Sequence, residues 1–459
     1  MKKIFNILFL LVASATFCAA QWTELGTGAN SLNANTIYFL DSDAAGNIYA
    51  GGNLNSSGWS SIAKWNGISW ENLSTNINGW TNNSNIYAMH TDTSGNICIG
   101  AFNSSLGNYV AKWNGTLWTL LGTGSNALNA NYAINAITSD GNGNVYAAGD
   151  FYNSEGKRYV AKWDGTSWSE IGTANNKLNA IMTLYSLTLD ALGNIYVAGY
   201  INSYTGPEDT ITVSKWNGIN WSTLGEGSNS VYSNGAGLPM VINSSGELII
   251  AMNYFLIDQG VFSSKKVAKW DGSNWIELNS GAINLGPEDI VTALAIDSYD
   301  KLYAICSKSL NSNNYITKRE GTAWEYVGTD TNLFSTPNNF ISDITTDPSG
   351  NIYVAGNFKN VAGYSFVAKY ENTSTSAINI ENKNISIYPN PTSSILNIDL
   401  KSESDRIEIC LYNLLGENLL HHNLNTKNYQ LDLSQYSSGI YFISVGTEKE
   451  NTIRKVVKQ

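Results

Sequence analysis

Charged residues, histidine and proline are scarce in this sequence of 459 residues. Asp, Glu, Lys and Arg make up only 14% of it, against roughly 25% in an average globular protein. This composition excludes a coiled coil, a charged disordered tail and a typical helical enzyme. With three histidines in the whole chain, few groups are suited to acid-base chemistry or metal ligation, which counts against catalysis.

Basic residues are also outnumbered, at 26 Lys and Arg against 37 Asp and Glu, for a net charge of −11. Nucleic acids and anionic membrane surfaces attract proteins with a basic footprint. The sequence contains no basic cluster that would supply one, so it predicts no nucleic-acid partner.

Aromatic residues and glycine are abundant, with 14 Trp, 26 Tyr and 41 Gly. Aromatic side chains favour strands, and glycine favours the tight turns between them. The composition therefore predicts an all-β fold.

Residues 1–20 have the pattern of a signal peptide, with Lys2 and Lys3 before an apolar run and small residues before Gln21. The run is too short to span a membrane, and no other segment is a transmembrane candidate. Cys18 would leave with the signal peptide. Cys98, Cys306 and Cys410 remain, and we interpret Cys98 and Cys306, in strand-like runs, as buried free thiols. No disulfide, metal site or cofactor is assigned.

Two sequence patterns recur together at intervals of roughly 50 residues. One is Ala-Lys-Trp-Asn-Gly or a relative, and the other is Asp-x-x-Gly-Asn. Each repeat reads as four strands, exemplified by residues 133–139, 144–150, 159–163 and 168–172. In each Asp-x-x-Gly-Asn phrase, an Asx turn closed by the aspartate is expected to join the first two strands.

Strand counting predicts a seven-bladed β-propeller over residues 21–373. The chain starts with a fourth strand at Trp22, and its last repeat lacks one. The N-terminal strand should therefore complete the last blade and close the ring, leaving no open sheet edge. Twelve tryptophans occupy repeat positions, where pairs such as Trp65 and Trp70 should pack across a hairpin.

The phrase from Asp190 to Gly199 resembles bacterial propeller repeats of the NHL and kelch-like kind. After a linker at residues 374–383, residues 384–459 read as a small Ig-like β-sandwich. That segment resembles the type A C-terminal sorting domain of the type IX secretion system. Its matching positions are Tyr388, Pro389, Asn390, Pro391, Gly439, Tyr441, Lys455 and Lys458.

The sorting resemblance implies export across the outer membrane, with the type IX machinery and a sortase-like peptidase as partners. The product would be secreted or attached to the cell surface. An ordinary fibronectin-like module is the alternative interpretation of the same strands.

One kind of link joins the second and third strands of a blade, and another joins one blade to the next. Both kinds must lie on the same face of a propeller. That variable face should carry five aromatic residues among many Asn and Ser residues. They are Trp59, Trp80, Tyr132, Tyr152 and Tyr204. Aromatic faces beside amide groups suit glycans or protein surfaces, so these residues form the predicted binding site. Solvated loops with scattered aromatics are the alternative.

Two other functions remain open. An enzyme such as a polysaccharide lyase or glycoside hydrolase would need carboxylates or a His and Tyr pair converging at the channel mouth. The links offer only Glu155, Glu208, Asp209 and Asp258, in different blades. We interpret His90, the one propeller histidine, as a structural residue without a neighbouring ligand. A structural surface-layer component is the third possibility.

Overall fold

The computed structural model describes residues 22–54, 60–75, 84–172, 175–201, 211–225, 238–251, 255–257, 261–263, 267–278, 290–307, 314–328, 339–371, 385–390, 392–400, 407–413, 418–424, 426, 428–447 and 451–458. Two compact units, Met1–Asn372 and Thr373–Gln459, make up the chain. In the described residues, strands account for all regular structure except three short 3-10 helices. The prediction of an all-β chain is therefore confirmed.

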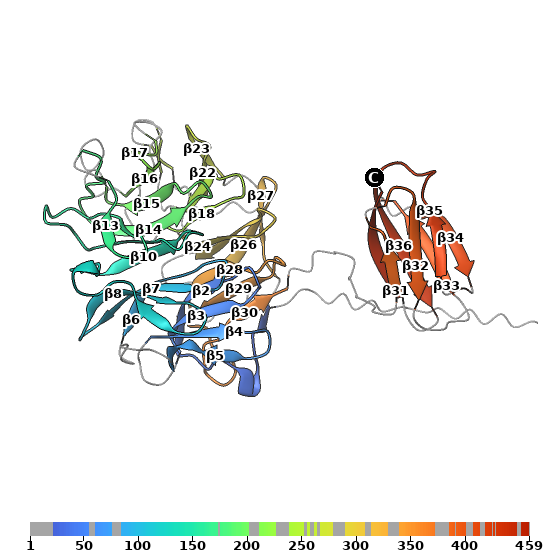
Figure 1. The fold of residues 1–459 in the computed structure, drawn as a ribbon, viewed down its shortest axis with the longest axis horizontal. Coiled ribbons are helices and arrows are strands. Elements are labelled where there is room, and N and C mark those ends of the chain that lie inside the picture. Colours follow the sequence, from blue (N-terminus) through green and yellow to red (C-terminus); the bar gives the residue numbers. More distant parts are fainter. Residues whose placement is uncertain are drawn as a thin grey trace, which may run out of the picture. The chain divides into compact units, whose positions relative to one another are not determined.

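The first unit contains seven four-stranded antiparallel sheets in its described residues (Figure 1). The first two comprise β2 (Thr36–Ser42), β3 (Ile48–Asn53), β4 (Ser61–Trp65) and β5 (Trp70–Asn72), then β6 (Asn85–Thr91), β7 (Ile97–Asn103), β8 (Gly107–Trp113) and β9 (Trp118–Leu120). The next two comprise β10 (Ile134–Ser139), β11 (Val145–Gly149), β12 (Ala161–Trp163) and β13 (Trp168–Glu170), then β14 (Leu184–Leu189), β15 (Ile195–Gly199), β16 (Thr212–Trp216) and β17 (Trp221–Thr223).

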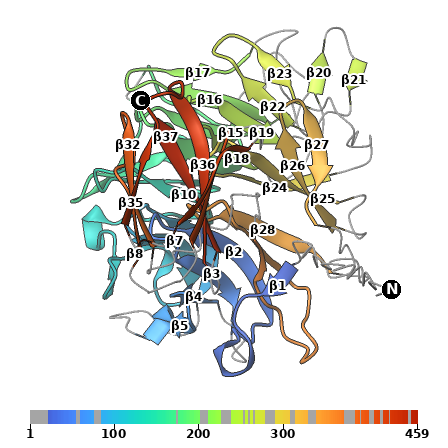
Figure 2. The same ribbon diagram turned by 90° about the vertical axis from the view of Figure 1, so that its right-hand side faces the viewer.

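The fifth sheet comprises β18 (Met240–Ile242), β19 (Leu248–Ala251), β22 (Val267–Trp270) and β23 (Trp275–Glu277). Between its second and third strands, β20 (Phe255–Ile257) and β21 (Val261–Ser263) form a separate two-stranded sheet (Figure 2). The sixth comprises β24 (Ile290–Ile296), β25 (Leu302–Ser307), β26 (Asn314–Glu320) and β27 (Ala323–Tyr326). The seventh comprises β28 (Ile341–Thr346), β29 (Ile352–Gly356), β30 (Ala368–Tyr370) and the N-terminal β1 (Trp22–Glu24).

The pairing of β1 with β30 joins the two ends of the first unit. Trp22 lies opposite Tyr370 in the register, and the strands are antiparallel, as the sequence predicted. The first strand of each sheet contacts the first strand of the next, in the order β2, β6, β10, β14, β18, β24 and β28. Strand β28 contacts β2 in turn, and Figure 1 shows these blue and orange strands side by side. The order of contacts is therefore cyclic.

The aspartate of each repeated phrase closes the turn between the first two strands. Asp43 Oδ1 accepts the backbone N–H groups of Ala45 and Asn47 at 3.0 and 2.9 Å, as expected of an Asx turn. Its Oδ2 accepts the Asn47 amide and the Tyr49 hydroxyl at 2.7 and 2.9 Å. Aspartates 140, 190 and 347 repeat all four bonds. The sequence did not predict the tyrosine bond.

Tryptophans link each sheet to its neighbour as well as packing within a hairpin. The rings of Trp65 and Trp70 lie 5.7 Å apart across their hairpin, as predicted. The indole N–H of Trp70 also donates to the carbonyl of Leu25, the residue after β1 of the seventh sheet, at 2.9 Å. The other six fourth-strand tryptophans make the equivalent bond to the preceding sheet, at 2.6–3.4 Å. Trp22 donates to the Val327 carbonyl, which completes the circuit.

Apolar side chains fill the spaces between adjacent sheets. One cluster combines Ile37 and Ala50 of the first sheet with Ala355 of the seventh and Val367, which precedes β30, and these four residues are fully buried. Because burial of apolar area is the main stabilising contribution, each sheet depends on both of its neighbours. Buried Cys98 and Cys306 lie in such clusters and form no disulfide, and burial raises the pKa of Cys98 to about 12.

The second unit contains two antiparallel sheets that share one core. One comprises β31 (Ile385–Tyr388), β32 (Ile395–Leu400) and β35 (Asn428–Asp432). The other comprises β34 (Asn418–Leu424), β33 (Ile407–Tyr412), β36 (Gly439–Thr447) and β37 (Asn451–Lys458). Residues such as Leu396, Ile409 and Ile443 are fully buried between them.

Candidate functional site

Of the five aromatic residues predicted on the variable face, two are described. Links from second to third strands and between successive sheets lie at one end of each sheet, which we call the loop face, because the sheet order is sequential. Tyr132 and Tyr152 lie in such links at the third sheet. Trp59, Trp80 and Tyr204 lie outside the described residues.

The two tyrosines contact each other and remain open to solvent. Their ring centroids are 5.7 Å apart with an interplanar angle of 34°, and the residues are 56% and 37% exposed. The Arg158 guanidinium lies over the Tyr152 ring, 5.4 Å from its centroid. We call Tyr132, Tyr152 and Arg158 the tyrosine site. Sequence analysis predicted the two tyrosines separately and did not identify Arg158.

Backbone contacts hold the tyrosine site in place. Asn131 accepts the Tyr152 N–H at 3.0 Å and donates its amide to the Tyr152 carbonyl at 3.1 Å. Arg158 donates to the Ile181 carbonyl at 3.1 Å, and its backbone pairs with both Tyr152 and Ala180. The site is thus held by residues of three links, which join β9 to β10, β11 to β12 and β13 to β14. Because these residues are already held in place, less conformational entropy is lost on binding.

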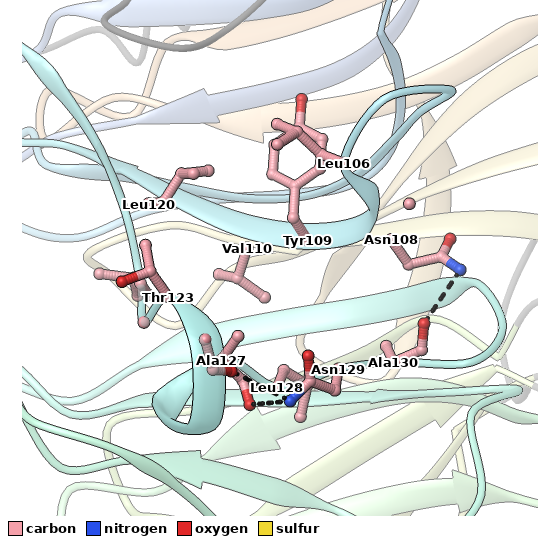
Figure 3. Close-up of a pocket in the computed structure, with 14 residues that line it drawn as sticks. Leu106, Asn108, Tyr109, Val110, Leu120, Thr123, Ala127, Leu128, Asn129 and Ala130 are labelled. Carbon is pink, nitrogen blue, oxygen red and sulfur yellow. Dashed lines mark hydrogen bonds between the residues drawn. The ribbon is translucent and has the colours of Figure 1, made fainter.

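A pocket of about 420 Å³ lies beside the first part of the link between β9 and β10, the link that also contains Tyr132. It is lined by apolar residues such as Leu106, Val110 and Leu128, with the Asn108 and Asn129 amides among its polar groups (Figure 3). Asn108 donates to the Ala130 carbonyl at 3.2 Å. Asn129 has a φ of 50°, in the left-handed region that asparagine tolerates better than most residues. This turn leads directly into Asn131 and Tyr132.

Two carboxylates and a histidine meet between the first strands of sheets seven, one and two. Asp343 accepts the Leu40 N–H at 2.8 Å, and Asp41 accepts the Thr91 N–H at 2.5 Å. His90 Nδ1 lies 3.7 Å from Asp41 Oδ2. Asp41 is therefore one carboxylate beside His90, and within the described residues no third potential metal ligand joins them. Asp41 and His90 are 49 residues apart and occupy equivalent positions in adjacent repeats, which could have indicated their proximity.

These carboxylates satisfy backbone donors at the open edges of the first strands. Asp343 also accepts the Ile344 N–H at 2.9 Å, and Asp41 the Ser42 N–H at 2.9 Å. Both oxygens of each carboxylate are therefore engaged, which favours a structural role. Burial raises the pKa of Asp41, and burial followed by the nearby Asp41 charge raises the pKa of Asp343 to about 7.

We expect the first unit to lose stability as the pH rises from about 4 to about 7. The folded state holds a proton on Asp343 in this range, whereas an unfolded aspartate, with a pKa near 3.9, has released it. Urea midpoints at pH 5 and pH 7 measure the effect, and Asp343→Asn should flatten the slope while keeping the side-chain volume. An equally steep slope in the variant would assign the dependence to other groups.

Of the four carboxylates considered for catalysis, only Glu155 lies within the described residues. Glu155 lies on the loop face, 2.8 Å from Lys177, and its side chain is 58% exposed. Lys177 also lies 3.8 Å from Glu170, so Glu155 belongs to a surface ion-pair group. Glu208, Asp209 and Asp258 lie outside the described residues.

In the second unit, the predicted sorting positions lie along two paired strands and the segment beside them. Gly439 pairs with Lys458, and Phe442 with Lys455, in the register of β36 and β37. Asn390 accepts the Val457 N–H at 2.9 Å, which ties the opening of the segment to the final strand. The first part of the sorting segment is therefore hydrogen-bonded to its basic final strand.

The remaining sorting positions stabilise turns and strand ends. Tyr441 is 8% exposed and donates its hydroxyl to the Ser437 carbonyl at 2.7 Å. The Tyr388 hydroxyl donates to the Asp399 carboxylate at 2.6 Å, and Pro389 is the residue after Tyr388. Pro391 lies outside the described residues.

Comparison with solved structures shows likeness of fold at low identity. The chain resembles PorZ, described as an essential bacterial surface component of the type-IX secretion system of Porphyromonas gingivalis, with 13% identity and a TM-score of 0.52. The match covers 93% of this chain and 59% of PorZ, so this chain spans less than two thirds of its length. A puromycin-hydrolysing peptidase of Mycobacterium tuberculosis matches with 9% identity and a TM-score of 0.50, over 83% of this chain and 60% of the peptidase.

No curated protein matches the chain. None of the helices in its described residues has the length and apolar character needed to cross a membrane. Residues 386–459 match the family described as "Secretion system C-terminal sorting domain", which confirms the sorting segment predicted from the sequence. The chain therefore ends in a sorting domain of the type IX system, and the protein is exported to the cell surface or secreted.

Proposed function

We propose that this protein is a surface or secreted β-propeller that binds glycans through its loop face, with protein surfaces as the other ligand class. Its parts would be a signal peptide (1–20), a seven-bladed propeller of NHL or kelch-like type (21–373), a linker (374–383) and an Ig-like sorting domain (384–459). The type IX machinery and a sortase-like peptidase would be its export partners.

The cyclic contacts of the seven sheets support the propeller assignment. Each sheet donates a tryptophan indole bond to the one before it, and β1 supplies the fourth strand of the seventh. A ring of this kind places all links of the loop face around one opening. A binding surface can then draw side chains from several sheets.

The exposed pairing of Tyr132 with Tyr152 is the observation that carries the binding proposal. Large aromatic side chains are normally at least half buried, yet Tyr132 is 56% exposed beside a second exposed ring. Sugar rings offer C–H groups that pack on aromatic faces and hydroxyls that bond to amides. The adjacent pocket, with Asn108 and Asn129, supplies both kinds of surface.

Arg158 restricts which ligands fit best. Its guanidinium is held by Tyr152 and the Ile181 carbonyl, and its Nε is buried without a partner in the structure. The other guanidinium N–H groups of Arg158 can donate to a ligand oxygen beside the Tyr152 ring. We therefore favour glycans that present an oxygen-rich group beside a ring face.

A glycan array probed with residues 21–375 tests this proposal. Replacing either Tyr132 or Tyr152 by Ala should weaken binding by about 2- to 12-fold, equivalent to roughly 0.5–1.5 kcal/mol for one aromatic contact. Trp59→Ala, Trp80→Ala and Tyr204→Ala test the three predicted residues that the structure does not describe. Absence of binding together with depolymerisation of a polysaccharide would replace this proposal with the enzyme alternative.

A further inference from the structure

Three side chains with metal-ligating chemistry come together on the outer face of the sorting domain. On β33, the alternate residues Ile407, Ile409 and Leu411 are buried in the core at 0–1% exposure. Glu408 and Cys410 must therefore project from the opposite face, because successive strand residues alternate. Cys410 pairs directly with His421 of the neighbouring strand β34. We call Glu408, Cys410 and His421 the outer-face triad.

The ligand atoms of the triad are close enough to share one ion. A carboxylate oxygen, the thiol sulfur and an imidazole nitrogen all lie within 4.8 Å of one another. His421 Nε2 and Glu408 Oε1 are 2.7 Å apart. The side chains of His421 and Glu408 are 47% and 54% exposed, while Cys410 is only 8% exposed. An ion can thus reach the triad from solvent, yet the sulfur is shielded.

We propose that the outer-face triad binds Zn²⁺. Zinc takes thiolate, imidazole and carboxylate ligands at distances of about 2.0–2.3 Å, and three protein ligands leave its fourth position for water. Mg²⁺ and Ca²⁺ are hard ions that prefer oxygen ligands, so a thiolate ligand disfavours their binding here. The negative charges of the thiolate and of Glu408 would balance the charge of the ion. Binding releases the thiol proton to solvent, and no electron transfer is involved.

A fourth residue on the same face is placed to orient the sulfur. Tyr412 lies two residues after Cys410 on β33, so its side chain projects from the same face as the sulfur. Outer partners of this kind commonly hold metal ligands in position. Ser444 lies opposite Cys410 on β36, so the sulfur is flanked by polar groups on that side.

Such a site would link β33 to β34 through side chains of the two neighbouring strands. A ligand that binds only the folded state stabilises it by mass action. The site belongs to the sorting domain and does not depend on the proposed glycan binding. If a peptidase removes that domain after export, the site would act during export only.

Cobalt and zinc titrations of the chain from residue 21 to residue 459 test the proposal. One equivalent of Co²⁺ should produce a thiolate-to-cobalt charge-transfer band, and one equivalent of Zn²⁺ should abolish it. Cys410→Ser and His421→Gln should each remove the band, and Glu408→Gln should weaken Co²⁺ binding at least 10-fold. His422→Gln is the matched control, since His422 bonds to the Tyr429 hydroxyl instead.

A second readout covers the case in which a variant does not fold. In the unmodified chain, Zn²⁺ should slow alkylation of Cys410, located by mass spectrometry, while alkylation of Cys98 and Cys306 stays unchanged. No band and no protection in folded protein would overturn the proposal. A band that persists in Cys410→Ser would assign the metal to another thiol and overturn it equally.

Discussion

Deletion of residues 384–459 is expected to leave the protein in the periplasm, with no detectable copies at the cell surface or in the medium. The matched sorting domain occupies residues 386–459, and its two sheets share one core. Cell fractionation followed by immunodetection measures the distribution. We expect near-complete loss of export, because the first unit supplies no second sorting segment in its described residues.

Point substitutions separate a sorting role from general damage to the domain. Asn390→Ala removes the bond to the Val457 N–H and should reduce export, since it frees the opening of the segment from the final strand. Gln430→Ala, at an exposed position of β35, is the matched control and should export normally. Unchanged surface display after the complete deletion would contradict the sorting assignment.

Removal of the closing strand should strongly destabilise the first unit. Trp22 is 6% exposed, its ring lies 5.2 Å from Tyr370, and its indole donates to the Val327 carbonyl. Leu25 adds a backbone bond to the Val367 carbonyl at 2.8 Å. Trp22→Ala alone should lower the free energy of unfolding by about 3–5 kcal/mol, as for other buried aromatic residues. Deletion of residues 22–25 should cost more and expose the edge of β30 to aggregation.

Urea unfolding of residues 21–375 measures this loss, and moving the strand provides its control. Residues 21–26 placed after Tyr370, behind a short Asn-Gly turn, would form the same fourth strand by a hairpin, as in the other six sheets. This rearranged chain should recover most of the lost stability. If deletion leaves the urea midpoint unchanged, β1 does not close the ring.

The fold was predictable because its signals are repeated. Asp43 and its counterparts indicated the turns, and the fourth strand that the last repeat lacks indicated the role of Trp22. The indole bonds between sheets were missed, although each accepting carbonyl lies three residues after a fourth-strand tryptophan, as Leu25 follows Trp22. That constant spacing was visible in the sequence, but only the structure shows that the acceptor belongs to the neighbouring sheet.

The sites were less predictable because they join residues from different segments. Tyr132 and Tyr152 were selected individually as loop aromatics, but nothing in the sequence shows that they contact each other or that Arg158 lies over one ring. Asp343 meets Leu40 where the first and seventh sheets of the first unit adjoin, which local patterns do not reveal. Similarly, Cys410 and His421 become neighbours only through the register of β33 and β34.

Calorimetric titration of the best array glycan into residues 21–375 tests most directly whether the loop face is the binding surface. We predict a saturable interaction that Tyr132→Ala and Tyr152→Ala each weaken by about 2- to 12-fold. Tyr299→Ala should leave it unchanged, because Tyr299 is 74% exposed in a turn at the opposite end of its sheet. Equal affinities for all three variants and the unmodified protein would show that the glycan does not bind at the tyrosine site.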